Sequence, residues 1–186
     1  MSQPRRVRGA ALLAALVAAT GLTSLTSLTS PAHAAGSVTC DTAGTMYFKP
    51  GVQIVPLRQD IEIRGANGSC RDSTGLGIDE ARLTANFSGV WLTCELGGGG
   101  TGHGTGTLDW IQDDGTRTRS NLDLNFESNI ASEVTLSGQV VGGPLDGERF
   151  SAHLSADLLR GTLKCTVGGP FGGAKSVGYH GEFTVG

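Results

Sequence analysis

The sequence predicts an all-β domain folded as an antiparallel β-sandwich, with a closed β-barrel as the alternative. Three observations support this fold class. Apolar and polar residues alternate in several short segments, glycines recur at short intervals, and no segment after residue 34 places apolar residues at sustained helical spacing. Short strands joined by turns about every ten residues are typical of both folds.

The clearest predicted strand covers residues 81–88, where Ala81, Leu83, Ala85 and Phe87 alternate with polar residues. The same period of two recurs over 121–127 and 149–157. Weaker candidates are 45–49, 52–55, 59–64, 90–95, 106–111, 134–141, 162–167 and 179–185. Each strand is expected to have one buried and one exposed face.

Glycine-containing segments between these strands predict the turns. Asp113-Asp114-Gly115 supplies the Asp-Gly step that a tight hairpin needs for positive φ. Further turns are predicted at Gly142 to Gly147 and at Arg160-Gly161. The run from Gly97 to Gly106 lacks the Gly-Lys-Ser/Thr ending of a phosphate-binding loop, so we expect a mobile hairpin loop there.

Residues 1–34 are predicted to be a cleaved signal peptide. Three arginines precede an apolar run over 9–21, and Ala32-His33-Ala34 fits the small-x-small rule for cleavage after Ala34. The apolar run has about 13 residues, fewer than the roughly 20 that a membrane-spanning helix needs, so secretion is preferred to a permanent anchor. The mature chain is then one secreted all-β domain over 35–186.

The cysteines, Cys40, Cys70, Cys94 and Cys165, all follow the predicted cleavage site. In an exported protein they are expected to form two disulfides. Of the three possible pairings we favour Cys40 with Cys70 and Cys94 with Cys165, because the first pair brackets its own group of strands. Zinc is the alternative, but no two cysteines have metal-ligand spacing and no histidine adjoins one. We therefore expect no metal and no other cofactor.

Charge restricts the partners that the domain is expected to bind. The full chain has a net charge of −3, and removing the arginines of the signal peptide makes the mature domain more acidic. Such a surface repels nucleic acid and anionic lipid. The expected partner is an extracellular polysaccharide or a secreted protein.

Four segments spread over most of the mature chain form a set: Phe48-Lys49-Pro50-Gly51-Val52, Gly104 to Trp110, Gly142 to Gly147, and Lys164-Cys165. Together with the signal peptide and the four cysteines, they resemble a broad group of uncharacterised secreted proteins of actinobacteria. The resemblance implies a β-sandwich with two disulfides, and it implies no activity.

No catalytic set is recognised in the sequence. His153 shares a polar strand face with Ser151, Ser155 and Asp157, but residues two apart on a strand are separated by about 6.8 Å, too far for a nucleophile and its base. Another polar face consists of Asn121, Asp123, Asn125 and Glu127. These side chains project in parallel, whereas calcium ligands converge from a tight turn. We interpret both faces as solvated.

Trp91 and His103 are the candidate binding residues. Trp91 shares the parity of Phe87 but not that of Leu92, so a bulge at Ser88-Gly89 decides whether it is buried or exposed. We expect Trp91 in the core, with an exposed aromatic platform as the alternative, whereas Trp110 is expected to fill the core. His103 would lie in the predicted loop, where binding residues concentrate.

These observations predict a non-catalytic extracellular module that binds a partner or associates with the cell envelope. An inhibitor of an extracellular hydrolase is the first alternative, because small disulfide-bonded β domains with exposed loops can block active sites. A small secreted hydrolase using His103 or His153 is the second.

Overall fold

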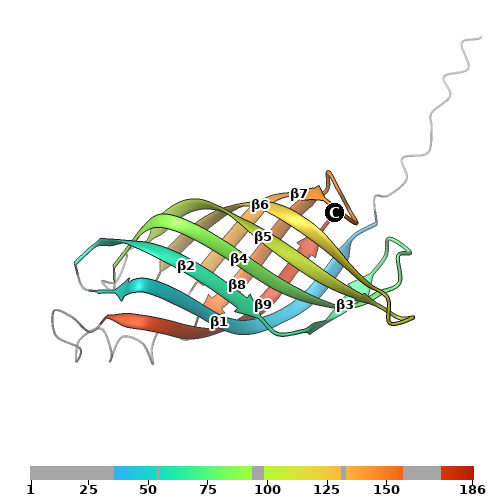
Figure 1. Ribbon diagram of the computed structural model, residues 1–186, viewed down its shortest axis with the longest axis horizontal. Helices are drawn as coiled ribbons and strands as arrows, with labels where there is room; N and C mark the ends of the chain where they lie inside the picture. The colour runs from blue at the N-terminus through green and yellow to red at the C-terminus, as the bar shows by residue number, and fades with distance from the viewer. Residues whose placement is uncertain (1–35, 54, 94–98, 131–132, 157–172) are drawn as a thin grey trace, which may run out of the picture. The chain divides into compact units, whose positions relative to one another are not determined.

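A computed structural model describes residues 36–53, 55–93, 99–130, 133–156 and 173–186. Within these ranges the chain forms nine strands and no helix (Figure 1). The strands are β1 (Val38–Val52), β2 (Leu57–Gly65), β3 (Gly68–Asp72), β4 (Ile78–Leu92), β5 (Gly100–Gln112), β6 (Arg117–Ile130), β7 (Glu133–Gly142), β8 (Arg149–Ala156) and β9 (Ala174–Val185). All pair antiparallel, which confirms the predicted all-β class.

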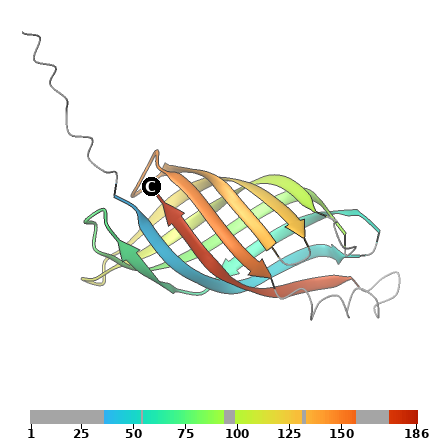
Figure 2. The same cartoon turned by 180° about the vertical axis from the view of Figure 1, so that it is seen from behind.

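Hydrogen-bonded pairing runs through all nine strands. The C-terminal part of β1 pairs with β2 and its N-terminal part with β3, and both β2 and β3 pair with β4. From β4 to β9 each strand pairs with the next one along the chain, and β9 pairs with the other edge of β1 (Figure 2). Each described strand therefore has a partner on both of its edges.

The alternation seen in the sequence produces one buried and one exposed face. In β8 the exposed and buried residues alternate without a break, and β4 and β6 follow the same pattern over most of their length. Aromatic side chains pack together on the buried face, with Phe87 against Phe126 and Trp110 and Phe150 both against Phe183. Burial of apolar surface is the main favourable term in folding, and aromatic rings bury large areas.

Trp110 is fully buried, as predicted, and its indole is hydrogen-bonded. Its Nε1–H donates to Ser120 Oγ over 2.8 Å, and the Ser120 hydroxyl donates to the carbonyl of Pro144 in the turn between β7 and β8. This chain of hydrogen bonds ties three elements together inside the fold.

The prediction of a loop over Gly97 to Gly106 is wrong for Gly100 to Gly106. Gly100 to Gly106 belong to β5, where glycines alternate with Thr101, His103 and Thr105. A Cβ at Gly102 would overlap Val90 Cγ2, and one at Gly104 would lie 2.6 Å from Phe87 Cδ1. The glycines therefore make room on the buried face for large side chains of β4. A strand this rich in glycine is not recognisable from its composition.

A β-bulge joins two predicted strands, 81–88 and 90–95, into β4. The register between β2 and β4 shifts between Gln59 and Ile61, and Gly89 has a φ of 70°. The freed amide of Gly89 donates to Asp60 Oδ1 over 3.3 Å. Since one extra residue reverses which face a side chain occupies, Trp91 is exposed while Val90 and Leu92 are buried. The expectation that Trp91 lies in the core is wrong, and the alternative is correct.

Two turns form where the sequence predicts them. Between β5 and β6 the Gly115 amide donates to the Gln112 carbonyl, and Gly115 has a φ of 81°. Between β7 and β8, positive φ angles occur at Gly142, Gly143, Leu145 and Gly147. Positive φ is the conformation for which glycine is suited.

Cys40 and Cys70 form a disulfide, which is the first of the two predicted pairings. The two residues lie directly opposite each other where β1 pairs with β3. The predicted Cys94–Cys165 bridge, the signal peptide, the strand over 162–167 and the turn at Arg160-Gly161 lie outside the described residues.

Candidate binding face

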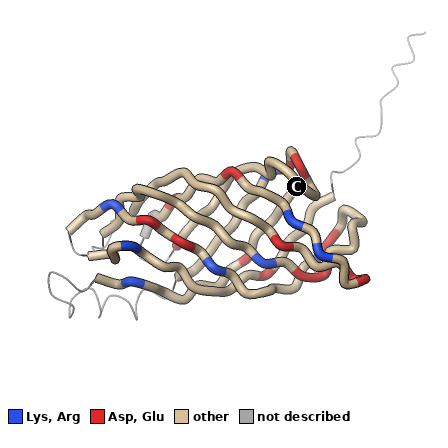
Figure 3. The backbone as a smooth tube through the Cα atoms, viewed as in Figure 1, with Lys and Arg blue, Asp and Glu red and all other residues tan. Residues whose placement is uncertain are grey.

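Exposed side chains of β1, β2 and β4 form the surface that we call the aromatic face. It consists of Tyr47, Lys49, Arg58, Asp60, Glu62, Arg64, Asn86, Ser88 and Trp91. The strands place these residues side by side, since Tyr47 is opposite Glu62, Glu62 is opposite Asn86, and Arg58 is opposite Trp91. Charges of both signs are interspersed along these strands (Figure 3).

Tyr47 lies at one end of the aromatic face and is 40% exposed. The guanidinium carbon of Arg64 lies 5.1 Å from the ring centroid. Arg64 is itself held by Glu62 through two hydrogen bonds of 2.6 and 2.9 Å. The hydrogen bond from Arg64 is the main reason that the pKa of Glu62 is lowered, with some opposition from desolvation and a further contribution from charge attraction. Tyr47, Arg64 and Glu62 therefore form an ordered charged group.

Trp91 lies towards the other end of the face and is 52% exposed. Arg58, directly opposite on β2, places its guanidinium carbon 5.3 Å from the ring centroid. The cross-strand partners of Tyr47 and Trp91 are Glu62 and Arg58, whose positions along β2 are separated by about 13 Å at the usual rise of a strand. The two rings are thus spaced along one surface by a rigid element.

A surface pocket of about 380 Å³ lies between β1, β2 and β4. Its exposed lining consists of Tyr47, Lys49, Asp60, Glu62, Arg64, Asn86 and Ser88. The exposed part of the lining therefore combines the ring of Tyr47 with carboxylate, amide, hydroxyl, ammonium and guanidinium groups. Trp91 lies beyond Ser88 along β4 and extends the same face.

This combination of groups suits a ligand that is apolar on one side and rich in hydroxyls around its edge. A sugar ring has that character, because its C–H groups pack on an aromatic ring while its hydroxyls exchange hydrogen bonds with carboxylates, amides and guanidinium groups. Tyrosine and tryptophan offer large contact areas at a low cost in side-chain entropy.

His103 does not join this face. It lies on β5 with an exposed side chain, and its Nε2 is 3.2 Å from Asp123 Oδ1 on β6. His103 and Trp91 are absent from the lining of the pocket, so the structure does not bring the two sequence candidates together there. Asp123 and its neighbours on the polar face of β6 (Asn121, Asn125 and Glu127) are exposed.

His153 lies on the exposed face of β8, opposite Thr135 on β7 and Glu182 on β9. Ser155, on the same face, is opposite His180. Among the hydrogen bonds of the described residues, none joins either histidine to a serine. In the described ranges no group of His, Cys, Asp and Glu is arranged to hold a metal ion.

Comparisons of this chain with protein families, curated proteins and solved structures found no match. The described ranges contain no helical segment with the length and hydrophobicity of a membrane span. The candidate site is therefore defined by its own geometry.

The sequence alone did not identify Tyr47, Arg58, Glu62 and Arg64 as candidate binding residues. A signal was present in residues 58–64, where Arg58, Asp60, Glu62 and Arg64 occupy alternate positions. Four charged residues in phase mark the exposed face of a strand. Their neighbours on β1 and β4, which supply the aromatic rings, follow only from the strand pairing.

Proposed function

We propose that this chain is an exported, non-catalytic module that binds a carbohydrate on the aromatic face. The observation that carries the proposal is the pair of exposed rings, Tyr47 and Trp91, set on one sheet surface with a polar pocket beside them. Tyrosine and tryptophan combine a large apolar ring with a polar group, and both are enriched at binding interfaces. The acidic character of the domain and the predicted secretion agree with an extracellular polysaccharide as the partner.

We also infer that the sheet closes on itself as a barrel. The pairing of β9 with β1 supports closure over the two stacked layers of a sandwich. A closed ladder has no free edge at which another chain could add a strand, so binding would use side chains on the exposed face.

Export belongs to the same proposal. Signal removal after Ala34 would leave a mature chain that begins at Ala35. Intact-mass and N-terminal analysis of protein recovered from the culture medium measures this directly. A product retained in the cell with residues 1–34 still attached would contradict export while leaving carbohydrate binding open to its own test.

The binding test measures depletion of the purified mature protein by insoluble cellulose, chitin and cell-wall polysaccharide. We expect saturable binding to at least one of them, weakened about tenfold or more by Trp91→Ala and by Tyr47→Ala, because each variant removes a stacking ring. Val141→Ala, which truncates an exposed apolar side chain on β7, is the matched control and is expected to bind normally.

Two results would contradict the proposal. One is the absence of binding to any of these polysaccharides, and the other is binding that both aromatic variants retain in full. If the protein instead lowers the rate of a secreted protease or glycosidase in a parallel assay, inhibition replaces carbohydrate binding as the better account.

A further inference from the structure

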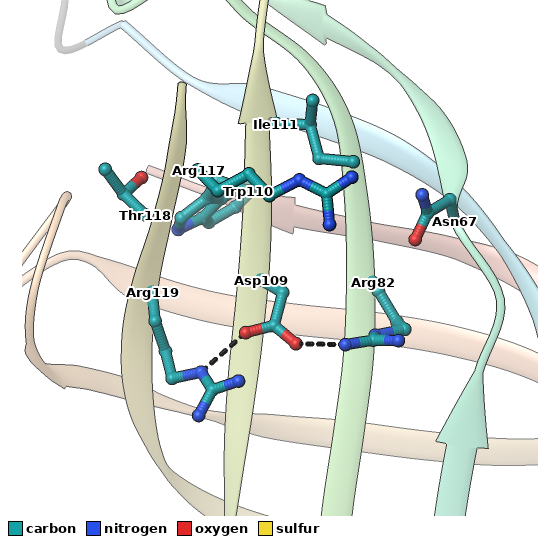
Figure 4. A pocket seen from close by; sticks show the side chains of 8 residues that line it. All are labelled: Asn67, Arg82, Asp109, Trp110, Ile111, Arg117, Thr118 and Arg119. Carbon is teal, nitrogen blue, oxygen red and sulfur yellow. Dashed lines mark hydrogen bonds and ion pairs between the residues drawn. The ribbon is translucent and has the colours of Figure 1, made fainter. Parts of the chain in front are cut away.

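A second surface pocket, which we call the arginine pocket, lies on the exposed face of β4, β5 and β6 (Figure 4). Its volume is about 350 Å³, and its polar lining includes Asn67, Arg82, Asp109, Arg117 and Arg119. The arginine pocket shares no residue with the aromatic face, so any ligand bound there is independent of the proposed carbohydrate binding.

Asp109 fixes two of the arginines. Strand pairing places Arg82 and Arg119 directly opposite it on β4 and β6. Arg119 Nε donates to Oδ1 over 2.5 Å and Arg82 Nη2 donates to Oδ2 over 2.7 Å, so both carboxylate oxygens are occupied. The hydrogen bond from Arg119 is the main reason that the pKa of Asp109 is lowered, against desolvation and with a smaller contribution from Arg82. Asp109 thus stays ionised and holds both guanidinium groups in place.

Most of the donors in the pocket have no acceptor among the described residues. A guanidinium group carries five N–H donors. Arg82 and Arg119 each use one nitrogen in a hydrogen bond to Asp109. Arg117 extends from β6 across β5 in Figure 4, and no ion pair to it occurs within the described ranges. The ion pairs with Asp109 therefore explain the positions of Arg82 and Arg119 but not that of Arg117.

The side chains that line the pocket carry a net positive charge. Three arginines face a single lining carboxylate. Outside the lining, Glu80 accepts a hydrogen bond from Asn67 Nδ2 over 3.0 Å, and Asp113 and Asp114 lie in the turn between β5 and β6. Asp114 Oδ1 accepts a hydrogen bond from the Thr116 amide. The net positive charge is therefore confined to the lining itself, where the arginine donors lie, and the other carboxylates lie at its periphery.

We infer that the arginine pocket binds an oxyanion, namely a carboxylate, sulfate or phosphate group, through the free donors of Arg82, Arg117 and Arg119. Guanidinium groups match the geometry of such anions and pair with them through parallel hydrogen bonds. The volume exceeds that of a water molecule about tenfold, so the pocket also has room for the group to which the anion is attached. The anion is either a free ion or part of a larger molecule such as an acidic oligosaccharide.

The test follows amide and arginine side-chain NMR signals of the mature protein during titration with sodium sulfate, with sodium chloride as the counter-titration at equal ionic strength. We expect saturable shifts at Arg82, Arg117 and Arg119 with sulfate alone. Arg117→Gln should weaken binding about tenfold or more, because it removes a charge and its hydrogen bonds. Arg117→Lys, which keeps the charge and loses the planar fork, should give an intermediate affinity.

Arg149→Gln is the matched control, since Arg149 is exposed on β8 and lies outside the pocket. A second titration compares uronate oligosaccharides with neutral ones of equal length. Binding of sulfate but not of uronate oligosaccharides identifies a free anion, and tighter binding of the uronate oligosaccharides identifies an anionic group on a larger ligand. The inference is overturned if neither gives saturable shifts, or if Arg117→Gln and Arg149→Gln bind equally well. Circular dichroism of both variants checks that each remains folded.

Discussion

Ser120 shows how one small polar residue can hold the buried face together. It is fully buried between the indole of Trp110, from which it accepts a hydrogen bond, and the carbonyl of Pro144, to which it donates one. Gln59 plays a similar part, because its buried side-chain amide bonds both the N–H and the C=O of Gly51 near the end of β1. Buried polar groups are tolerated when they are paired in this way.

Replacing Ser120 with Ala tests this arrangement. We expect Ser120→Ala to lower the free energy of unfolding by about 1–3 kcal/mol, because the Trp110 N–H and the Pro144 carbonyl lose their partner. Chemical denaturation followed by tryptophan fluorescence measures the change. Ser151→Ala, on the exposed face of β8, is the control and should change stability little. Equal stability of the two variants would contradict the assigned role of Ser120.

At the scale of the element, β4 depends on the bulge at Gly89. The bulge reverses the phase of the strand, which keeps Val90 and Leu92 buried and leaves Trp91 exposed on the aromatic face. Asp60, on β2, stabilises the bulge because its Oδ1 accepts a hydrogen bond from the Gly89 N–H. A single glycine therefore positions the most exposed aromatic ring of the candidate site.

Gly89→Ala is expected to destabilise the protein by about 1–2 kcal/mol, because a φ of 70° is unfavourable for a residue with a Cβ. Space around the residue is not the cause, since an added Cβ would meet only the end of Arg58 at 3.9 Å. Gly178→Ala on β9 is the matched control, because that glycine has no positive φ and has similar room. Thermal unfolding of the two variants should differ. A Gly178→Ala variant that is as unstable as Gly89→Ala would remove the conformational explanation.

The carboxylate of Asp72, the last residue of β3, is hydrogen-bonded across the turn that leads to β4. Asp72 accepts hydrogen bonds from the amide and hydroxyl of Thr74 and from the amide of Ile78. Burial by itself would raise the pKa of Asp72, but these hydrogen bonds outweigh it and the pKa is lowered. The folded state therefore favours the ionised form of the Asp72 carboxyl group.

A pH dependence of stability follows from Asp72. A pKa that is lower in the folded than in the unfolded state stabilises the fold above the unfolded pKa of about 3.9, and this stabilisation is lost as the pH falls through the folded pKa. We expect Asp72→Asn to be less stable than wild type at pH 7, with the difference shrinking below about pH 4. Denaturation from pH 7 to pH 2 measures it.

Asp146→Asn is the control for the pH experiment, because Asp146 is exposed in the turn between β7 and β8. It should follow the wild-type curve. If the difference between Asp72→Asn and wild type is as large at pH 2 as at pH 7, the effect of Asp72 is not electrostatic.

At the scale of the whole molecule, the contacts that matter join distant parts of the sequence. β1 pairs with β9, and the Cys40–Cys70 bridge closes a loop whose ends are 30 residues apart and which contains all of β2. Pairing on both edges leaves no described strand exposed for addition of another chain, a common route to aggregation.

Removing the disulfide should lower stability without changing the fold. For a loop of this length the chain-entropy model gives about 3.6 kcal/mol, and measured values commonly fall near 2–4 kcal/mol. We expect the Cys40→Ser/Cys70→Ser variant to lose stability in this range in urea, with an unchanged strand signal in circular dichroism. Wild-type stability in the variant would show that strand pairing alone holds β1 against β3.

The local pattern of the sequence determined much of the fold. The period of two identified the cores of β4, β6 and β8, the Asp-Gly step identified the turn after β5, and the positions of the cysteines indicated the bridge from Cys40 to Cys70. These features are readable because alternation, turn chemistry and oxidised cysteines act within a segment or through one covalent bond.

Only the tertiary structure decided the two candidate binding surfaces. The exposure of Trp91 depends on a register shift against β2, and Gly100 to Gly106 form a strand because side chains of β4 occupy the space beside them. Arg82, Asp109 and Arg119 are distant in sequence and meet because three strands align. The physical reason is that each segment specifies its own two faces, whereas register depends on how all the strands pack around one core.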